Sequence, residues 1–246
     1  MKRTGALIVN YNMPERTDAL VERIVKCCDQ PVYICVIDNG SDLQPPSKYS
    51  TVKLPVNVQT TGGWLAGLEH LRSVPDIEYY WFLITSADIP NEEDVLTPMV
   101  EWLDAHPDAV GIHPALTEDS TTGWQHLITR GGDQPRRTWM IDNIASLYRK
   151  SWFDTIGWFD PKFTMAWGID LETCFIARQQ GKTLWVDERV KVRKITNIGY
   201  TMNRMNMAAE ERSRKAGDEM RRVLFDKYGP LYWQMMTEAN VTDEIK

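Results

Sequence analysis

Cysteine and histidine are scarce in this sequence of 246 residues, which holds four of each. No two cysteines have CxxC spacing and no histidine lies near a cysteine, so the pattern of a structural zinc site is missing. We therefore expect unpaired thiols in the core. The cysteines are Cys27, Cys28, Cys35 and Cys174.

Long apolar runs are missing as well. The longest, Ala6–Val9 and Tyr79–Ile84, have the length of a strand, and a membrane helix needs about 18 apolar residues. The charged start at Lys2 and Arg3 is followed by too short an apolar stretch for a secretory signal peptide. We expect a cytoplasmic protein without a transmembrane segment, for which peripheral membrane contact stays open.

An excess of basic charge is also absent. The formal net charge is −6, which argues against a general nucleic-acid binder. The sequence shows no internal repeat, no low-complexity segment and no linker, and 43% of its residues are hydrophobic. A chain of this length folds readily as one α/β domain, so we expect a single domain over residues 1–246.

The first half alternates between apolar runs of strand length and segments with helical periodicity. This order is typical of a Rossmann-like α/β fold, with a mostly parallel sheet covered by helices on both faces. The second half adds short strands, a polar loop or hairpin over residues 117–137 and a helix closed by Gly181. Expected strands are 5–10, 32–37, 52–58, 78–84, 110–114, 144–149, 183–186 and 190–192, and expected helices are 17–28, 62–72, 92–105, 170–180 and 208–227.

Polar residues follow three of the expected strands directly. They are Asn10-Tyr11-Asn12, Asp38-Asn39-Gly40-Ser41 and Ser86-Ala87-Asp88. Open α/β sheets bind ligands at the carboxyl ends of their strands, so these segments predict a ligand site.

Four segments in this order resemble the family 2 glycosyltransferases of the GT-A fold. The segments are Ala6–Asn12, Val36–Ser41, Thr85–Pro90 and Trp167–Cys174, and the resemblance extends from about residue 5 to residue 195. It implies an inverting hexosyl- or pentosyltransferase that uses a nucleotide-diphosphate sugar. It also implies a nucleotide-sugar-binding half at 1–105, an acceptor and catalytic half at 106–200, and a C-terminal helical extension at 201–246.

The resemblance assigns the donor nucleoside to the first strand ends. Asp38 would contact the nucleoside, Asn10, Tyr11 and Asn12 would form the base pocket, and Gly62 and Gly63 would lie near the donor. Two alternatives stay open. Asp38-Asn39-Gly40 is also an ordinary turn sequence, and the glycines also suit close packing of a helix.

The resemblance places an Asp-x-Asp-like motif at Ser86-Ala87-Asp88. Asp88 would bind Mn²⁺ or Mg²⁺ beside the diphosphate, although Ser86 stands where the family has its first acid. The family's later histidine ligand is also missing, and Arg193 or Lys194 would neutralise the diphosphate directly. The alternatives are that Asp88 is a turn or cap residue and that Arg193 lies on a solvated basic strand.

Asp170 corresponds to the family's catalytic base, which takes the proton of the acceptor hydroxyl. Its acidic neighbour in the family is replaced by Ile169. On the acceptor side we expect aromatic walls at Trp158 and Trp167, with Gly168 and His126 nearby. The alternative is that Asp170 only caps a helix.

The last third of the sequence leaves the acceptor open: a saccharide, a lipid-linked or macromolecular acceptor, or, with less support, a nucleic acid. Its basic residues are interleaved with acids, which is typical of a salt-bridged surface. A patch for a phosphate-bearing acceptor is the alternative. The basic residues are Arg204, Arg212, Arg214, Lys215, Arg221 and Arg222.

Two rival functions remain. A nucleotidyltransferase would carry a glycine-rich basic segment after the first strand, and Met13-Pro14-Glu15-Arg16 has no glycine. A non-catalytic nucleotide- or carbohydrate-binding protein on the same fold would explain the missing acidic neighbours at Ser86 and Ile169.

Overall fold

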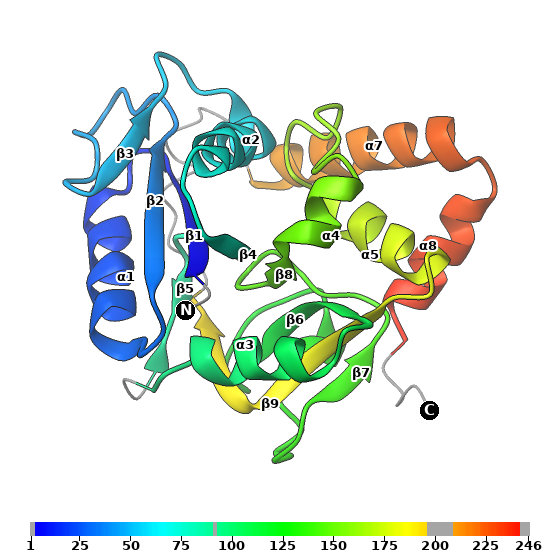
Figure 1. The fold of residues 1–246 in the computed structure, drawn as a ribbon. Coiled ribbons are helices and arrows are strands. Elements are labelled where there is room, and N and C mark those ends of the chain that lie inside the picture. Colours follow the sequence, from blue (N-terminus) through cyan, green and yellow to red (C-terminus); the bar gives the residue numbers. More distant parts are fainter. Residues whose placement is uncertain (1–2, 91–92, 196–208, 242–246) are drawn as a thin grey trace.

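The computed structural model describes residues 3–90, 93–195 and 209–241. Its centre is a sheet of nine strands in the order β3-β2-β1-β4-β8-β6-β9-β5, with β7 paired to β9 (Figure 1). The strands are β1 (Arg3–Asn10), β2 (Val32–Asp38), β3 (Ser50–Lys53), β4 (Ile77–Leu83), β5 (Ala87–Asp88), β6 (Ala109–Leu116), β7 (Arg136–Thr138), β8 (Leu147–Arg149) and β9 (Thr183–Lys194). Strands β5, β7 and β8 run antiparallel to their neighbours, and the other strands are parallel. The expected mostly parallel sheet is confirmed.

Helices cover both faces of this sheet. The helices are α1 (Pro14–Cys27), α2 (Gln59–Arg72), α3 (Leu96–Ala105), α4 (Lys150–Thr155), α5 (Ile169–Gln179), α7 (Ala209–Tyr228) and α8 (Leu231–Ala239), and a 3₁₀ turn, η2, spans Gln125–Leu127. Figure 1 shows α1 and α2 on opposite sides of β1 and β2. Successive side chains of β1 point to opposite faces of the sheet. Leu7 therefore packs in the core under α2, and Ile8 packs in the core under α1 and α3. All four cysteines are free.

Helix α3 and strand β9 are among the elements that differ from the sequence-based expectation. Helix α3 begins at Leu96, where the Asp94 carboxylate accepts hydrogen bonds from the backbone N–H groups of Leu96 (3.0 Å) and Thr97 (3.1 Å); residue 92, the expected start, lies outside the described residues. The two strands expected at 183–186 and 190–192 are the single strand β9. The polar residues between them do not break it, because their side chains are paired within the fold.

The C-terminal helices α7 and α8 pack onto α5 and belong to the core. Val223, Leu224 and Met235 are buried in the same cluster as Phe175, and Arg178 pairs with Glu238 at 2.7 Å. The expected C-terminal helical part is therefore confirmed in the fold. In the part of the chain that the structure describes, no helix combines the length and apolar character needed to cross a membrane.

Candidate active site

Two cavities adjoin at the carboxyl ends of β1 and β4. The smaller has a volume of 250 Å³ and is lined mainly by residues between Val9 and Ser86. The larger has a volume of 570 Å³ and extends over the start of α5 to the C-terminal helices. Both cavities are lined by Thr60, Trp64, Ile84 and Arg212, which therefore mark their junction.

The smaller cavity receives only part of the predicted donor site. Tyr11 and Ser86 line it, together with Asn39 and Thr85. Asp38 lies behind it, with its Oδ1 accepting hydrogen bonds from Asn10 Nδ2 (2.9 Å) and Ser41 Oγ (2.7 Å). These buried contacts are those of the turn interpretation, and they fix the end of β2 against the end of β1.

Asn12 and the two glycines also serve the scaffold. The side-chain oxygen Oδ1 of Asn12 accepts hydrogen bonds from three backbone N–H groups, those of residues 42–44, and so holds that loop. A Cβ on Gly62 would lie 2.7 Å from Val58, and one on Gly63 would lie 2.9 Å from Val9. The glycines allow α2 to pack closely on β1, and Thr60 and Trp64 of that helix reach the cavities instead.

Asp88 is held by Arg193. Strands β5 and β9 pair antiparallel at these residues, and Arg193 Nη2 lies 2.7 Å from Asp88 Oδ2. A second carboxylate, that of Asp119, lies 3.7 Å from Arg193 Nη1. Both Asp88 and Arg193 lie outside the linings of the two cavities.

The side chains around Asp88 do not fit a divalent metal ion. They offer one carboxylate at the position of the Asp-x-Asp-like motif, a guanidinium already bound to that carboxylate, and Ser86 in place of the first acid. A metal ion on Asp88 would be repelled by the adjacent Arg193. Among the described residues, no group of three or more histidine, cysteine or acidic side chains could hold a metal ion.

Asp170 faces the larger cavity from the first turn of α5. Gly168 precedes it with a φ of 96°, and a Cβ there would lie 2.8 Å from both Phe163 and Met220, so the position requires glycine. Asp170 Oδ1 accepts the backbone N–H of Leu171 at 2.9 Å. Burial, followed by the nearby charge of Asp142, raises the pKa of Asp170 to about 8.

Asp142 is a second acid of this cavity, and the sequence analysis missed it. It lines the cavity together with Asp170 and Lys194. Burial raises the pKa of Asp142, and the Lys194 charge opposes that shift. The available signal was the single acid of the segment Met140–Ile144, which stands between the apolar pair Met140-Ile141 and Ile144, because a carboxylate there needs a functional or structural reason.

Of the predicted acceptor residues, Trp167 and Gly168 line the larger cavity. Trp167 is 43% exposed, and it contributes an apolar wall together with Trp124. Trp158 lies outside the lining and donates its Nε1 hydrogen to Asp154 at 2.7 Å. His126 is 3% exposed and bonds the Met140 carbonyl at 2.9 Å, so the structure does not bring it to the cavity.

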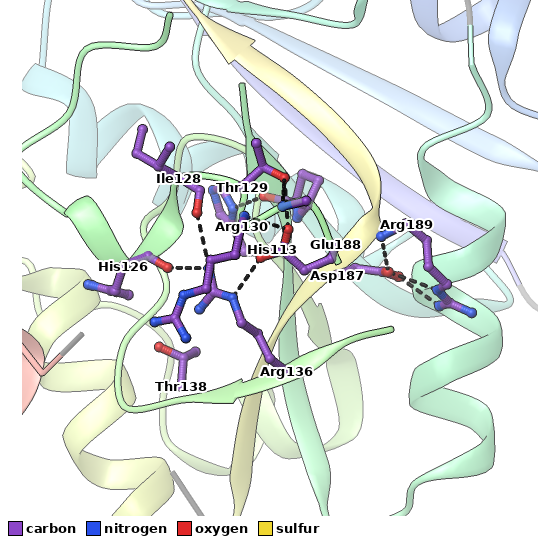
Figure 2. Close-up of polar contacts among 12 residues, drawn as sticks. His113, His126, Ile128, Thr129, Arg130, Arg136, Thr138, Asp187, Glu188 and Arg189 are labelled. Carbon is purple, nitrogen blue, oxygen red and sulfur yellow. Dashed lines mark hydrogen bonds and ion pairs between the residues drawn. The ribbon is translucent and has the colours of Figure 1, made fainter. Parts of the chain in front are cut away.

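The loop expected over residues 117–137 is fastened to β9 by the buried carboxylate of Glu188 (Figure 2). Glu188 is 2% exposed and accepts hydrogen bonds from Thr129 Oγ1 (2.8 Å), Arg130 N (2.9 Å) and Arg136 Nε (2.7 Å). Arg136 in turn donates to the carbonyls of His126 and Ile128. These contacts of Glu188 with Thr129, Arg130 and Arg136, here called the Glu188 latch, hold the loop in place. The same loop contributes residues 122–124 to the lining of the larger cavity.

Helix α7 holds the segment before Asp170. Glu219 accepts hydrogen bonds from Thr164 Oγ1 (2.7 Å) and the Met165 backbone (3.0 Å). Glu172, which is buried, bonds the Tyr228 hydroxyl at 2.7 Å and pairs with Lys227. The C-terminal helices therefore position both the loop before α5 and the first turn of α5, which carries the predicted base.

Comparison with solved structures defines the type of fold. GalNAc-T7, solved with UDP, GalNAc and Mn²⁺, has a TM-score of 0.61 and 12% identity over 80% of this chain and 44% of its own length. TarS 1–349 of S. aureus has a TM-score of 0.59 and 15% identity over 78% of this chain and 59% of its own. The mannosyltransferase PcManGT of Pyrobaculum calidifontis, solved with GDP-Man and Mn²⁺, has a TM-score of 0.59 and 13% identity over 96% of this chain and 73% of its own.

The fold is therefore of the GT-A type. This chain spans about half the length of the first two of these structures, and identities of 12–15% establish the fold alone. No protein-family model matches the sequence, and no curated protein matches it.

Proposed function

We propose that this protein is a nucleotide-sugar-dependent glycosyltransferase, related to family 2, that transfers a hexosyl or pentosyl group to an acceptor hydroxyl with inversion. The observation that carries the proposal is Asp170. Its carboxylate faces a 570 Å³ cavity that adjoins a second cavity at the strand ends, on a GT-A fold. A raised pKa of about 8 suits a general base that works near neutral pH.

The donor would occupy both cavities. The nucleoside would lie in the smaller one near Tyr11 and Ser86, and the sugar would lie in the larger one. This arrangement agrees with a donor half at 1–105 and an acceptor half at 106–200, to which residues 201–246 add α7 and α8 as further walls.

Asp170 would act on the acceptor from the side opposite the nucleotide. Its carboxylate takes the proton of the acceptor hydroxyl while that oxygen bonds to the anomeric carbon. The bond from the anomeric carbon to the diphosphate oxygen breaks, and the electron pair leaves with the nucleoside diphosphate. One base on one face gives a single displacement and therefore inversion.

The acceptor would stack on the aromatic wall of Trp167 and Trp124, as the face of a sugar ring does. A saccharide, free or lipid-linked, is the acceptor class that this wall supports. A cation at Asp88, as expected from the sequence, has little support from the donor set there, so no step is assigned to a metal ion.

Turnover separates this proposal from a non-catalytic binding protein. Wild-type protein is incubated with UDP-, GDP-, dTDP- and CMP-sugars and a panel of saccharide acceptors, and free nucleotide is measured by chromatography. A glycosyltransferase releases nucleotide from one donor class, and faster with its acceptor. Thermal stabilisation by a nucleotide sugar without any release would instead identify a binding protein, and neither effect would remove the donor site.

A further inference from the structure

Arg212 differs from the other basic residues of α7. Five cations of this helix pair with carboxylates, as the salt-bridged-surface interpretation expects: Arg214, Lys215, Arg221, Arg222 and Lys227. Among the described residues Arg212 has no such pair, and its Nε is buried without a hydrogen-bond partner. Burial lowers the pKa of Arg212, with no carboxylate to oppose the shift.

A half-buried guanidinium without a counter-ion is costly, so a structure that retains one needs a reason. Arg212 lines both cavities at their junction. Trp64, at the same junction, also leaves its buried indole N–H without a partner among the described residues. Two unsatisfied hydrogen-bond donors therefore belong to residues of one junction.

The chemistry of the ligand follows from this position. A nucleotide sugar with its nucleoside in one cavity and its sugar in the other must pass its diphosphate through the junction. A guanidinium binds phosphate oxygens in bidentate geometry and stays protonated. Lys194 adds a second cation to the lining of the larger cavity. It directly follows Arg193, which pairs with Asp88.

We propose that Arg212, together with Lys194, binds the donor diphosphate and stabilises its charge as the glycosidic bond breaks, in place of a divalent metal ion. The inference rests on the proposed function. We assign the diphosphate to Arg212 rather than to Arg193, because the Arg193 guanidinium pairs with Asp88 and Arg193 lies outside the linings of both cavities. The C-terminal helix would thus complete the donor site.

Equilibrium binding tests this inference. The dissociation constants of UDP, GDP and dTDP, and of the matching nucleosides, are measured by calorimetry on the full chain in EDTA and in Mn²⁺. We expect one diphosphate to bind equally well in both buffers. Arg212→Gln should weaken it roughly 10- to 100-fold, with nucleoside binding unchanged. Arg212→Lys should recover part of the loss, and Arg214→Gln, two residues along α7 on an exposed pair, should have no effect.

Thermal stability provides the second readout. Because Arg212→Gln removes an unpaired buried charge, the variant without ligand should melt at the same or a higher temperature than the wild type. A diphosphate affinity that needs Mn²⁺ and is unchanged in Arg212→Gln would overturn the inference while leaving the proposed function intact. If no nucleoside diphosphate binds the wild type, the donor site and this inference both fail.

Discussion

The guanidinium of Arg193 lies 2.7 Å from the carboxylate of Asp88, across the antiparallel pair of β5 and β9. The side chain that the sequence assigns to a metal ion is thus already neutralised by a residue of the chain itself. The pair ties the short strand β5 to the edge of the sheet, close to the carboxyl end of β4.

Removal of the Asp88 charge gives the first prediction. We expect Asp88→Asn to leave the affinity for nucleoside diphosphate within about threefold, because a structural ion pair does not touch the donor, whereas a lost metal ligand typically costs at least tenfold. Calorimetry in EDTA and in Mn²⁺ measures the effect, and Asp133→Asn, on the exposed loop, is the matched control. A large loss seen only in Mn²⁺ would restore Asp88 as a metal ligand.

Removal of the Asp170 carboxylate should slow transfer strongly and leave donor binding almost unchanged. A general base contributes about 10²- to 10⁴-fold, so we expect kcat for Asp170→Asn to fall by that factor while the donor dissociation constant stays within about threefold. Nucleotide release and calorimetry on the same preparation measure both quantities. If the variant keeps wild-type turnover, another residue is the base.

The pH profile of kcat/KM should report the raised pKa of Asp170. The base works only when deprotonated, so activity should rise with pH through about 8 and level off above it. Because the Asp142 charge raises this pKa, Asp142→Asn should move the rising limb to lower pH. The pH profiles of wild type, Asp142→Asn and the control Asp133→Asn are compared. If the rising limb of Asp142→Asn lies at the wild-type pH, Asp142 does not raise the pKa of the base.

The Glu188 latch should matter for stability more than for chemistry. Glu188→Ala removes the ion pair with Arg136, whose side chain is 11% exposed, so we expect a loss of about 3 kcal/mol in the free energy of unfolding. The exposed Glu118→Ala variant is the control for urea unfolding. Equal stability of the two variants would show that the latch does not hold the loop.

Much of the architecture could be predicted from the sequence. The apolar runs that became β1, β2 and β4 alternate with helical periodicity, and that pattern defines a parallel sheet before any contact is known. The sequence assigns the base role to Asp170 because its motif opens a helix after an aromatic loop. The structure places Asp170 in the lining of the larger cavity, and its role as a base stays a prediction.

The remaining site residues could not be predicted, because they meet only in three dimensions. Asp142 and Arg212 belong to no motif. Asp142 precedes α5 in the sequence and Arg212 follows it, and the fold brings both to the larger cavity. The family resemblance assigned Asp38 to the donor nucleoside. A sequence cannot show that Asn10 Nδ2 and Ser41 Oγ both donate hydrogen bonds to its Oδ1.

The most direct test of the central claim is a crystal structure of the protein with a bound nucleotide sugar. The nucleotide sugar to use is the one that raises the melting temperature most. The account predicts the nucleoside beside Tyr11, the diphosphate against Arg212 and the anomeric carbon facing Asp170. A nucleotide bound elsewhere, such as in the 490 Å³ cavity between Asn12 and Ala19, would contradict it.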